Sequence, residues 1–154
     1  MSDLESLYKE LIFEHSQNPH NFGAMPHPDK TSNGYNPVCG DRICLGLKMI
    51  SSPADIRLDD IKFEGEGCAI CMASASIMTD EVKGKTVSEV QSLVQALRSN
   101  LRGEELEVDS GTGKSVVLEG DIEALLGVRR FPVRIKCALL PWMTLKDALE
   151  GEKS

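Results

Sequence analysis

The order of hydrophobic and polar residues predicts strands in the first half of the chain and helices after them. Between Arg42 and Ile50 hydrophobic and other residues alternate, which is the period of a half-buried strand. A second strand is expected over Ile56–Phe63, and its phase slips at Asp59–Asp60, which indicates a β-bulge. Residues 51–54 form a turn between the two strands, which predicts an antiparallel hairpin with Thr31–Tyr35 as a candidate third strand.

Two stretches outside these strands have the composition or the spacing of helices. Ser2 and Glu5 form a capping box before an amphipathic helix that is expected to end at about His15. Prolines and glycines between residues 19 and 28 then predict an irregular connection. The small, helix-compatible residues of Ala69–Val82 predict a second helix.

The C-terminal half is expected to contain further helices. Thr86 begins a helix as the first residue of another capping box. The acidic segment 102–126 is expected to end in a short helix that stops at Gly127. The last helix is expected to start near Ala138, since Pro141 is best tolerated in a first helical turn.

The elements and the composition together indicate one globular domain. Strands followed by helices predict an α+β fold, with a small antiparallel β-sheet of about three strands packed with N-terminal and C-terminal helices. A length of 154 residues suits a single domain over residues 1–154, with an acidic insertion at about 102–126. Hydrophobic residues make up 41% and charged residues 27% of the chain, which excludes wholesale disorder.

The charges narrow the choice of partners. The net charge of −7 argues against a protein that binds nucleic acid. Residues 102–126 contain seven acidic and two basic residues, which is −5 of that total. Residues 127–137 contain no acid and four cations, namely Arg129, Arg130, Arg134 and Lys136. No hydrophobic run is long enough to span a membrane and the first residues are acidic, so a cytoplasmic protein without a membrane partner is expected.

Five cysteines in a reducing compartment favour metal binding or thiol chemistry over disulfides. Cys39 lies in a turn, with Asp41 two residues later, whereas Cys68 and Cys137 are each expected at the start of a helix. The dipole of a helix favours a thiolate at that position. Three thiolates and a carboxylate could form a four-coordinate zinc site or an incomplete site for an iron–sulfur cluster. From spacing alone, simple burial of these cysteines remains the alternative.

The other two cysteines and the three histidines are not among the predicted metal ligands. Cys44 is expected to pack on the strand face directed away from the metal-binding loops. Cys71 is expected to pack in the interior or to serve as an auxiliary thiol. The histidines lack metal-ligand spacing, and His15, His20 and His27 are interpreted as helix-end or surface residues.

Over nearly its whole length, the sequence resembles the IscU/SufU (NifU-N-like) family of iron–sulfur assembly proteins. The resemblance rests on NPVCGD at 36–41, on GEGCAICMASAS at 65–76 followed by KGK at 83–85, and on RIKCA at 134–138. It implies a compact α+β fold with a small antiparallel sheet. It also implies that three cysteines cluster at one exposed end and that a cysteine desulfurase is a partner.

Three departures from the IscU branch resemble SufU. Lys136 stands where IscU has a histidine, and residues 130–134 replace the IscU chaperone-docking motif. The segment between Cys68 and Cys137 is also longer than in IscU. Members of the SufU branch hold zinc with three cysteines and an aspartate, and accept sulfur from a SufS-type desulfurase. Cys71 departs from this branch, because serine is usual there.

The resemblance implies a Zn²⁺ site with four ligands: Cys39, Asp41, Cys68 and Cys137. Cys39, on its turn, is expected to accept persulfide sulfur from a SufS-type cysteine desulfurase for cluster biogenesis. Arg134 is expected either to pair with Asp41 or to remain a solvated surface cation. Lys136 and Cys71 are further auxiliary residues.

Three functions follow from this interpretation. The first is a zinc-dependent sulfurtransferase that acts with the desulfurase. The second is a non-enzymatic scaffold that holds iron or a [2Fe–2S] cluster transiently and passes it to downstream assembly proteins or apo-acceptors. The third is a structural zinc domain used as an interaction module.

Overall fold

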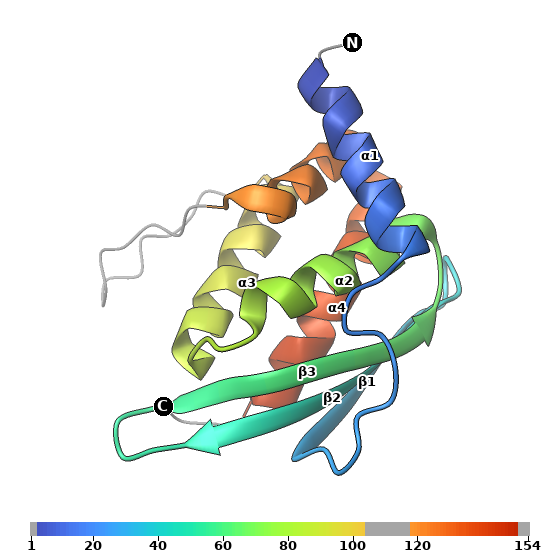
Figure 1. Ribbon diagram of the computed structural model, residues 1–154. Helices are drawn as coiled ribbons and strands as arrows, with labels where there is room; N and C mark the ends of the chain where they lie inside the picture. The colour runs from blue at the N-terminus through green and yellow to red at the C-terminus, as the bar shows by residue number, and fades with distance from the viewer. Residues whose placement is uncertain (1–2, 104–117, 151–154) are drawn as a thin grey trace.

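The structure is a computed structural model that describes residues 3–103 and 118–150 (Figure 1). Its elements, in chain order, are α1 (Asp3–Gln17), β1 (Lys30–Asn36), β2 (Asp41–Ser51), β3 (Ile56–Glu66), α2 (Ala69–Val82), α3 (Val87–Arg102), the 3₁₀ helix η1 (Gly120–Arg130) and α4 (Pro132–Leu149). Two expectations lie outside the described residues: the capping role of Ser2, and the part of the acidic insertion that covers residues 104–117.

The three strands form one antiparallel sheet in the order β1-β2-β3, as the alternating pattern predicts. The register shifts where Lys48 pairs with Asp60 and the next residue pairs with Leu58. Asp59 is therefore the extra residue of a bulge, at the predicted phase slip. The bulge keeps Leu58 and Ile61 both buried although they are three residues apart.

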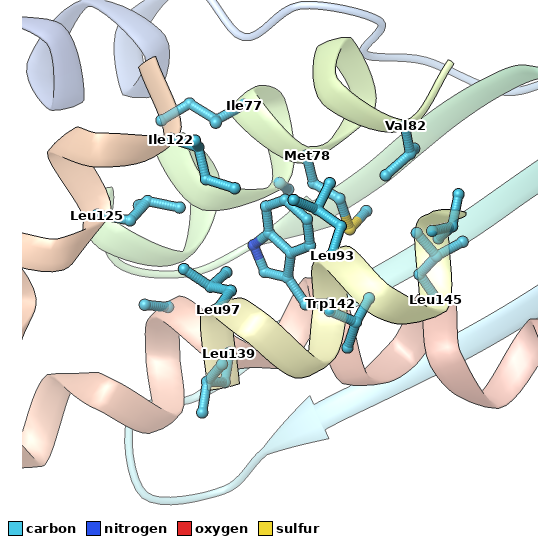
Figure 2. Packing of buried hydrophobic residues seen from close by; sticks show 14 of the residues in the cluster. Ile77, Met78, Val82, Leu93, Leu97, Ile122, Leu125, Leu139, Trp142 and Leu145 are labelled. Atoms are coloured by element: carbon cyan, nitrogen blue, oxygen red, sulfur yellow. The ribbon is translucent and has the colours of Figure 1, made fainter. Parts of the chain in front are cut away.

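The helices lie on one side of the sheet, where its hydrophobic face is buried (Figure 1). Trp142 of α4 lies at the centre of this core, among side chains from α2, α3 and η1 (Figure 2). Thr86 caps the start of α3, with the capping box that the sequence predicts. In the part of the chain that the structure describes, none of the helices could span a membrane.

Two predicted helix limits are wrong. The last helix begins at Pro132, not near Ala138, because Pro132 already occupies the first turn where proline is favoured. Pro141 instead lies inside α4, where it has no N–H for the carbonyl four residues earlier. The short helix near the end of the acidic segment does not stop at Gly127 but continues to Arg130. Cys137 is therefore in the body of a helix, and the expected effect of a helix start on its thiol does not apply.

Candidate metal centre

Cys39 lies in the tight turn that joins β1 to β2. Asn36 and Asp41 pair across the base of this turn, and the Asn36 side-chain oxygen accepts a hydrogen bond from the Val38 N–H at 3.2 Å. Gly40 has a φ of 70°, a conformation that glycine adopts without the strain other residues would carry. Val38 is 74% exposed, so the turn projects into solvent and brings Cys39 to the surface of the molecule.

Asp41 is the first residue of β2 and is fully buried, with 0% of its surface exposed. One carboxylate oxygen accepts a hydrogen bond from the Cys68 N–H at 2.8 Å, and the other lies 3.9 Å from the Cys68 Sγ. Gly67 makes this approach possible, because a Cβ on that residue would lie only 2.4 Å from the Asp41 Oδ1. Cys68 itself is the residue before the first turn of α2, as the sequence predicts.

Cys137 approaches the same place from α4. Its Sγ lies 3.1 Å from the Sγ of Cys39 and 3.8 Å from the side-chain nitrogen of Asn36. One potential ligand atom from each of Cys39, Asp41 and Cys137 lies within 4.8 Å of the other two. The structure thus brings together three of the four predicted ligands, with the fourth, Cys68, in contact with Asp41.

This donor set fits a zinc ion. Three sulfurs and one carboxylate oxygen match the ligand types and the coordination number of protein zinc sites. No lysine or arginine forms an ion pair with Asp41 among the residues that the structure describes. A buried carboxylate is normally paired with a cation or bound to a metal, so the site has the electrostatic character of one that accepts a cation.

Burial and hydrogen bonding favour neutral thiols deep in the site. Burial is the main cause that raises the pKa of the Cys137 thiol, and hydrogen bonds with Cys39, Asp41 and Cys68 raise it further. Burial also raises the pKa of Cys71, followed by the charges of Asp41 and Cys68. Cys71 is fully buried in the hydrophobic core, which agrees with the packing role considered for it.

The two basic residues predicted to be auxiliary, Arg134 and Lys136, lie on α4 close to Cys137 in the sequence. Hydrogen bonding to Cys137 raises the pKa of the Arg134 guanidinium, and the charges of nearby cysteines raise it further. Arg134 is exposed on α4, and no ion pair joins it to Asp41 in the part of the chain that the structure describes. Lys136 is exposed on α4, and Cys44 lies on the face of β2 opposite Asp41.

A buried hydrogen-bond network that the sequence did not indicate joins the two cysteine-bearing helices. The Ser74 hydroxyl of α2 donates to the Ala138 carbonyl of α4 at 2.5 Å. The Trp142 Nε1–H then donates to the Ser74 oxygen at 2.8 Å. Ser74 lies about two turns after Cys68, and Ala138 follows Cys137, so these contacts help to fix the two cysteines relative to each other.

The histidines also form contacts that their spacing does not reveal. His15 lies in the last turn of α1, as the helix-end interpretation predicts, but it is only 3% exposed, so the surface alternative is wrong for this residue. Its two ring nitrogens lie 2.7 Å from the Ser76 hydroxyl and 2.8 Å from an Asp121 carboxylate oxygen. His20 pairs with Asp80 near the surface. Because both ring nitrogens of His15 already have partners, we interpret this cluster as a structural link between α1, α2 and η1.

Comparisons with known proteins identify the family of this chain. The family described as the NifU-like N terminal domain matches residues 7–150. The zinc-dependent sulfurtransferase SufU of Bacillus subtilis is 41% identical over 152 residues, which cover 99% of this chain and 95% of that protein. The iron–sulfur cluster assembly scaffold protein IscU of Thermotoga maritima is 37% identical over 144 residues, which cover 94% of this chain and 93% of that protein.

A solved structure has the same fold. The crystal structure of FiSufU from Fervidobacterium islandicum AW-1 superposes with a TM-score of 0.75 at 31% sequence identity. The match covers 95% of this chain and 98% of that chain. The predicted α+β architecture is therefore confirmed.

Proposed function

This chain belongs to the NifU-like N terminal domain family, and from that membership we propose that it is a zinc-dependent sulfur acceptor in iron–sulfur cluster assembly. The observation that carries the proposal is the convergence of Cys39, Asp41 and Cys137 within 4.8 Å, with Cys68 in contact with Asp41. The similarity to the B. subtilis protein, a zinc-dependent sulfurtransferase, supports the same function.

Zinc would be held by all four predicted ligands: Cys39, Asp41, Cys68 and Cys137. When bound, it would supply the positive charge that keeps several thiolates together and prevents their protonation. The residues around the ligands have their own tasks. Gly67 leaves room for the Asp41 carboxylate, and Asn36 shapes the turn that carries Cys39 while its side-chain nitrogen faces Cys137.

Cys39 is the residue that we propose to accept sulfur. Its turn is exposed, whereas Cys137 is fully buried in the body of α4. In the transfer step the Cys39 thiolate attacks the outer sulfur of a persulfide on the donor protein. A new S–S bond forms at Cys39 while the S–S bond of the donor breaks, and the donor cysteine leaves as a thiolate. The sulfane sulfur changes carrier, so no external oxidant or reductant is required.

The proposed donor is a cysteine desulfurase of the SufS type, and the proposed receivers are downstream assembly proteins or apo-acceptors. Arg134 lies against Cys137 at the rim of the site. We propose that its charge helps to retain thiolate character there during transfer, with Lys136 as a second nearby cation. Cys71 is too deeply buried to meet a donor persulfide without local opening.

A scaffold function is the second candidate, since the T. maritima relative is named as a scaffold protein. In that case the same residues would hold a nascent [2Fe–2S] cluster, with Asp41 as its harder and more weakly bound ligand. Anaerobic reconstitution distinguishes the two functions. A cluster that forms on the protein and moves intact to an apo-acceptor would favour the scaffold.

The test of sulfur acceptance combines metal analysis with persulfide mapping. Protein purified without added iron is expected to contain one zinc per chain. After incubation with a SufS-type desulfurase and cysteine, mass spectrometry is expected to find the persulfide on Cys39. Cys39→Ser should lose it, whereas Cys44→Ser is the matched control, since Cys44 lies on the opposite face of β2. Sulfur absent from every cysteine of the unaltered protein would refute the proposal.

A further inference from the structure

A groove of about 780 Å³ lies between α1 and the segment 118–131, beside the first turn of α2. Its walls carry large hydrophobic side chains that are open to solvent. Phe13 of α1 is 63% exposed and Phe131, just before α4, is 57% exposed. Ile12, Ile70 and Leu126 also line the groove and are partly buried. Solvent-exposed aromatic residues around a hollow of this size are typical of a binding surface.

The charges around this groove are mainly positive. Lys9, Arg129 and Arg130 line it together with one acidic residue, Glu123. The Glu123 carboxylate accepts a hydrogen bond from the Tyr8 hydroxyl at 2.5 Å, so part of its hydrogen-bonding capacity is used within the wall. Residues 127–131, which form one side of the groove, include Arg129 and Arg130 and no acid. An acidic ligand would therefore be favoured at this groove.

The groove adjoins the cysteine site. Ala69 and Ile70, which form part of its lining, directly follow Cys68. On the other side, Phe131 is followed by α4, which carries Cys137. A segment that occupies the groove would thus lie next to Cys68, one of the proposed metal ligands, and at the start of the helix that carries another.

We infer that this groove seats an acidic segment with hydrophobic side chains from the cysteine desulfurase. The inference rests on the proposed function, because it assigns the groove to the protein that must bring a persulfide to Cys39. A second copy of this chain fits less well, because a symmetric contact would place the same cations opposite each other. Nucleic acid is disfavoured by the net charge of −7.

The first test measures how much of each variant is needed for half-maximal stimulation of desulfurase turnover, followed as alanine release. Arg129→Glu should raise this concentration about tenfold at low salt, and the difference should shrink at high salt. Phe13→Ser should raise it about tenfold at all salt concentrations, because a hydrophobic anchor is lost. Maximal stimulation, zinc content and melting temperature should stay close to those of the unaltered protein.

Two substitutions on the β-sheet serve as matched controls for these variants. Lys62→Glu reverses a charge on the outer face of β3, and Ile50→Ser removes an exposed hydrophobic side chain at the end of β2. Both should leave the half-maximal concentration unchanged. A photo-crosslinking residue in place of Phe13 should attach to a desulfurase peptide that contains several acidic residues.

The outcomes separate this inference from the proposed function. If the unaltered protein neither stimulates the desulfurase nor receives sulfur, the proposed function fails. If it does both, but Phe13→Ser and Arg129→Glu behave like their controls, the groove assignment alone is wrong. Crosslinking to a second copy of this chain, or to a desulfurase segment without acidic residues, would also overturn that assignment.

Discussion

Gly67 gives the most direct test of the site, because its lack of a side chain is what lets Asp41 approach Cys68. In Gly67→Ala the new Cβ would lie 2.4 Å from the Asp41 Oδ1, whereas ordinary contacts begin at 3.4 Å. The carboxylate must therefore retreat by the difference, about 1 Å. If it moves away from Cys68, the N–H···O distance grows from 2.8 Å to about 3.8 Å, beyond hydrogen-bonding range.

This displacement should weaken zinc binding. Asp41 is a proposed ligand, and the hydrogen bond from the Cys68 N–H orients its carboxylate. Loss of an orienting contact of this kind typically reduces metal affinity about 10–100-fold. Competition with a chromophoric chelator measures the affinity, and circular dichroism shows whether the fold is intact.

The control and a double variant make the reasoning falsifiable. Gly127→Ala should keep the affinity of the unaltered protein, because a Cβ there meets nothing within 4 Å. In an Asp41→Ala background, Gly67→Ala should add little, since the carboxylate that it displaces is already gone. Unchanged zinc affinity in the folded Gly67→Ala protein would refute the link between Gly67 and Asp41. Full additivity of the two substitutions would refute it as well.

Three further predictions concern the surroundings of the site. Ser74→Ala should destabilise the protein by about 1–3 kcal/mol, because the buried Trp142 N–H loses its acceptor. Urea denaturation of Ser74→Ala, Trp142→Phe and the double variant should show that the two substitutions are coupled, and additive effects would contradict the contact. Hydrogen bonding to the Thr86 backbone lowers the pKa of Glu89 from its ordinary 4.5. The stability that this cap contributes is therefore fully present above pH 4.5 and is lost as the pH falls through the lowered pKa of Glu89 in the folded protein. Glu89→Gln should remove that part of the pH dependence of the melting temperature; an unchanged profile would contradict it. Cys71→Ser should leave persulfide formation unchanged by mass spectrometry, and loss of the persulfide would contradict its burial away from the donor.

Local patterns predicted the sheet and the ends of several elements well, because their causes are local. The alternation after Arg42 follows directly from one buried strand face, and the phase slip at Asp59 marks the bulge. The start of α4 is harder to predict from the sequence, because Pro132 and Pro141 both fit a rule that places proline near a helix start. Packing of α4 against the sheet and the other helices allows Pro141 in its interior, and such packing is invisible in a single sequence.

The contacts that complete the site are also long-range. Asn36 reaches Cys137 across 101 positions of the chain, and Ser74 meets Trp142 across 68. The NPVCGD motif does contain Asn36, and an asparagine at a turn is a known signal for a side-chain contact with the backbone. Its approach to Cys137 could not be predicted in the same way, because it depends on how α4 lies against β1.

The arrangement gives a physical reason why Cys39, among the proposed ligands, should be the one that exchanges. Asp41 and Cys137 are fully buried on a strand and a helix, so moving either would disturb the core. Cys68 precedes α2, and its N–H is fixed to Asp41. Cys39 is attached only through an exposed turn, which can change conformation while the hydrogen bonds between β1 and β2 remain. A site with three fixed ligands and one on a turn can release a thiolate to a partner without unfolding.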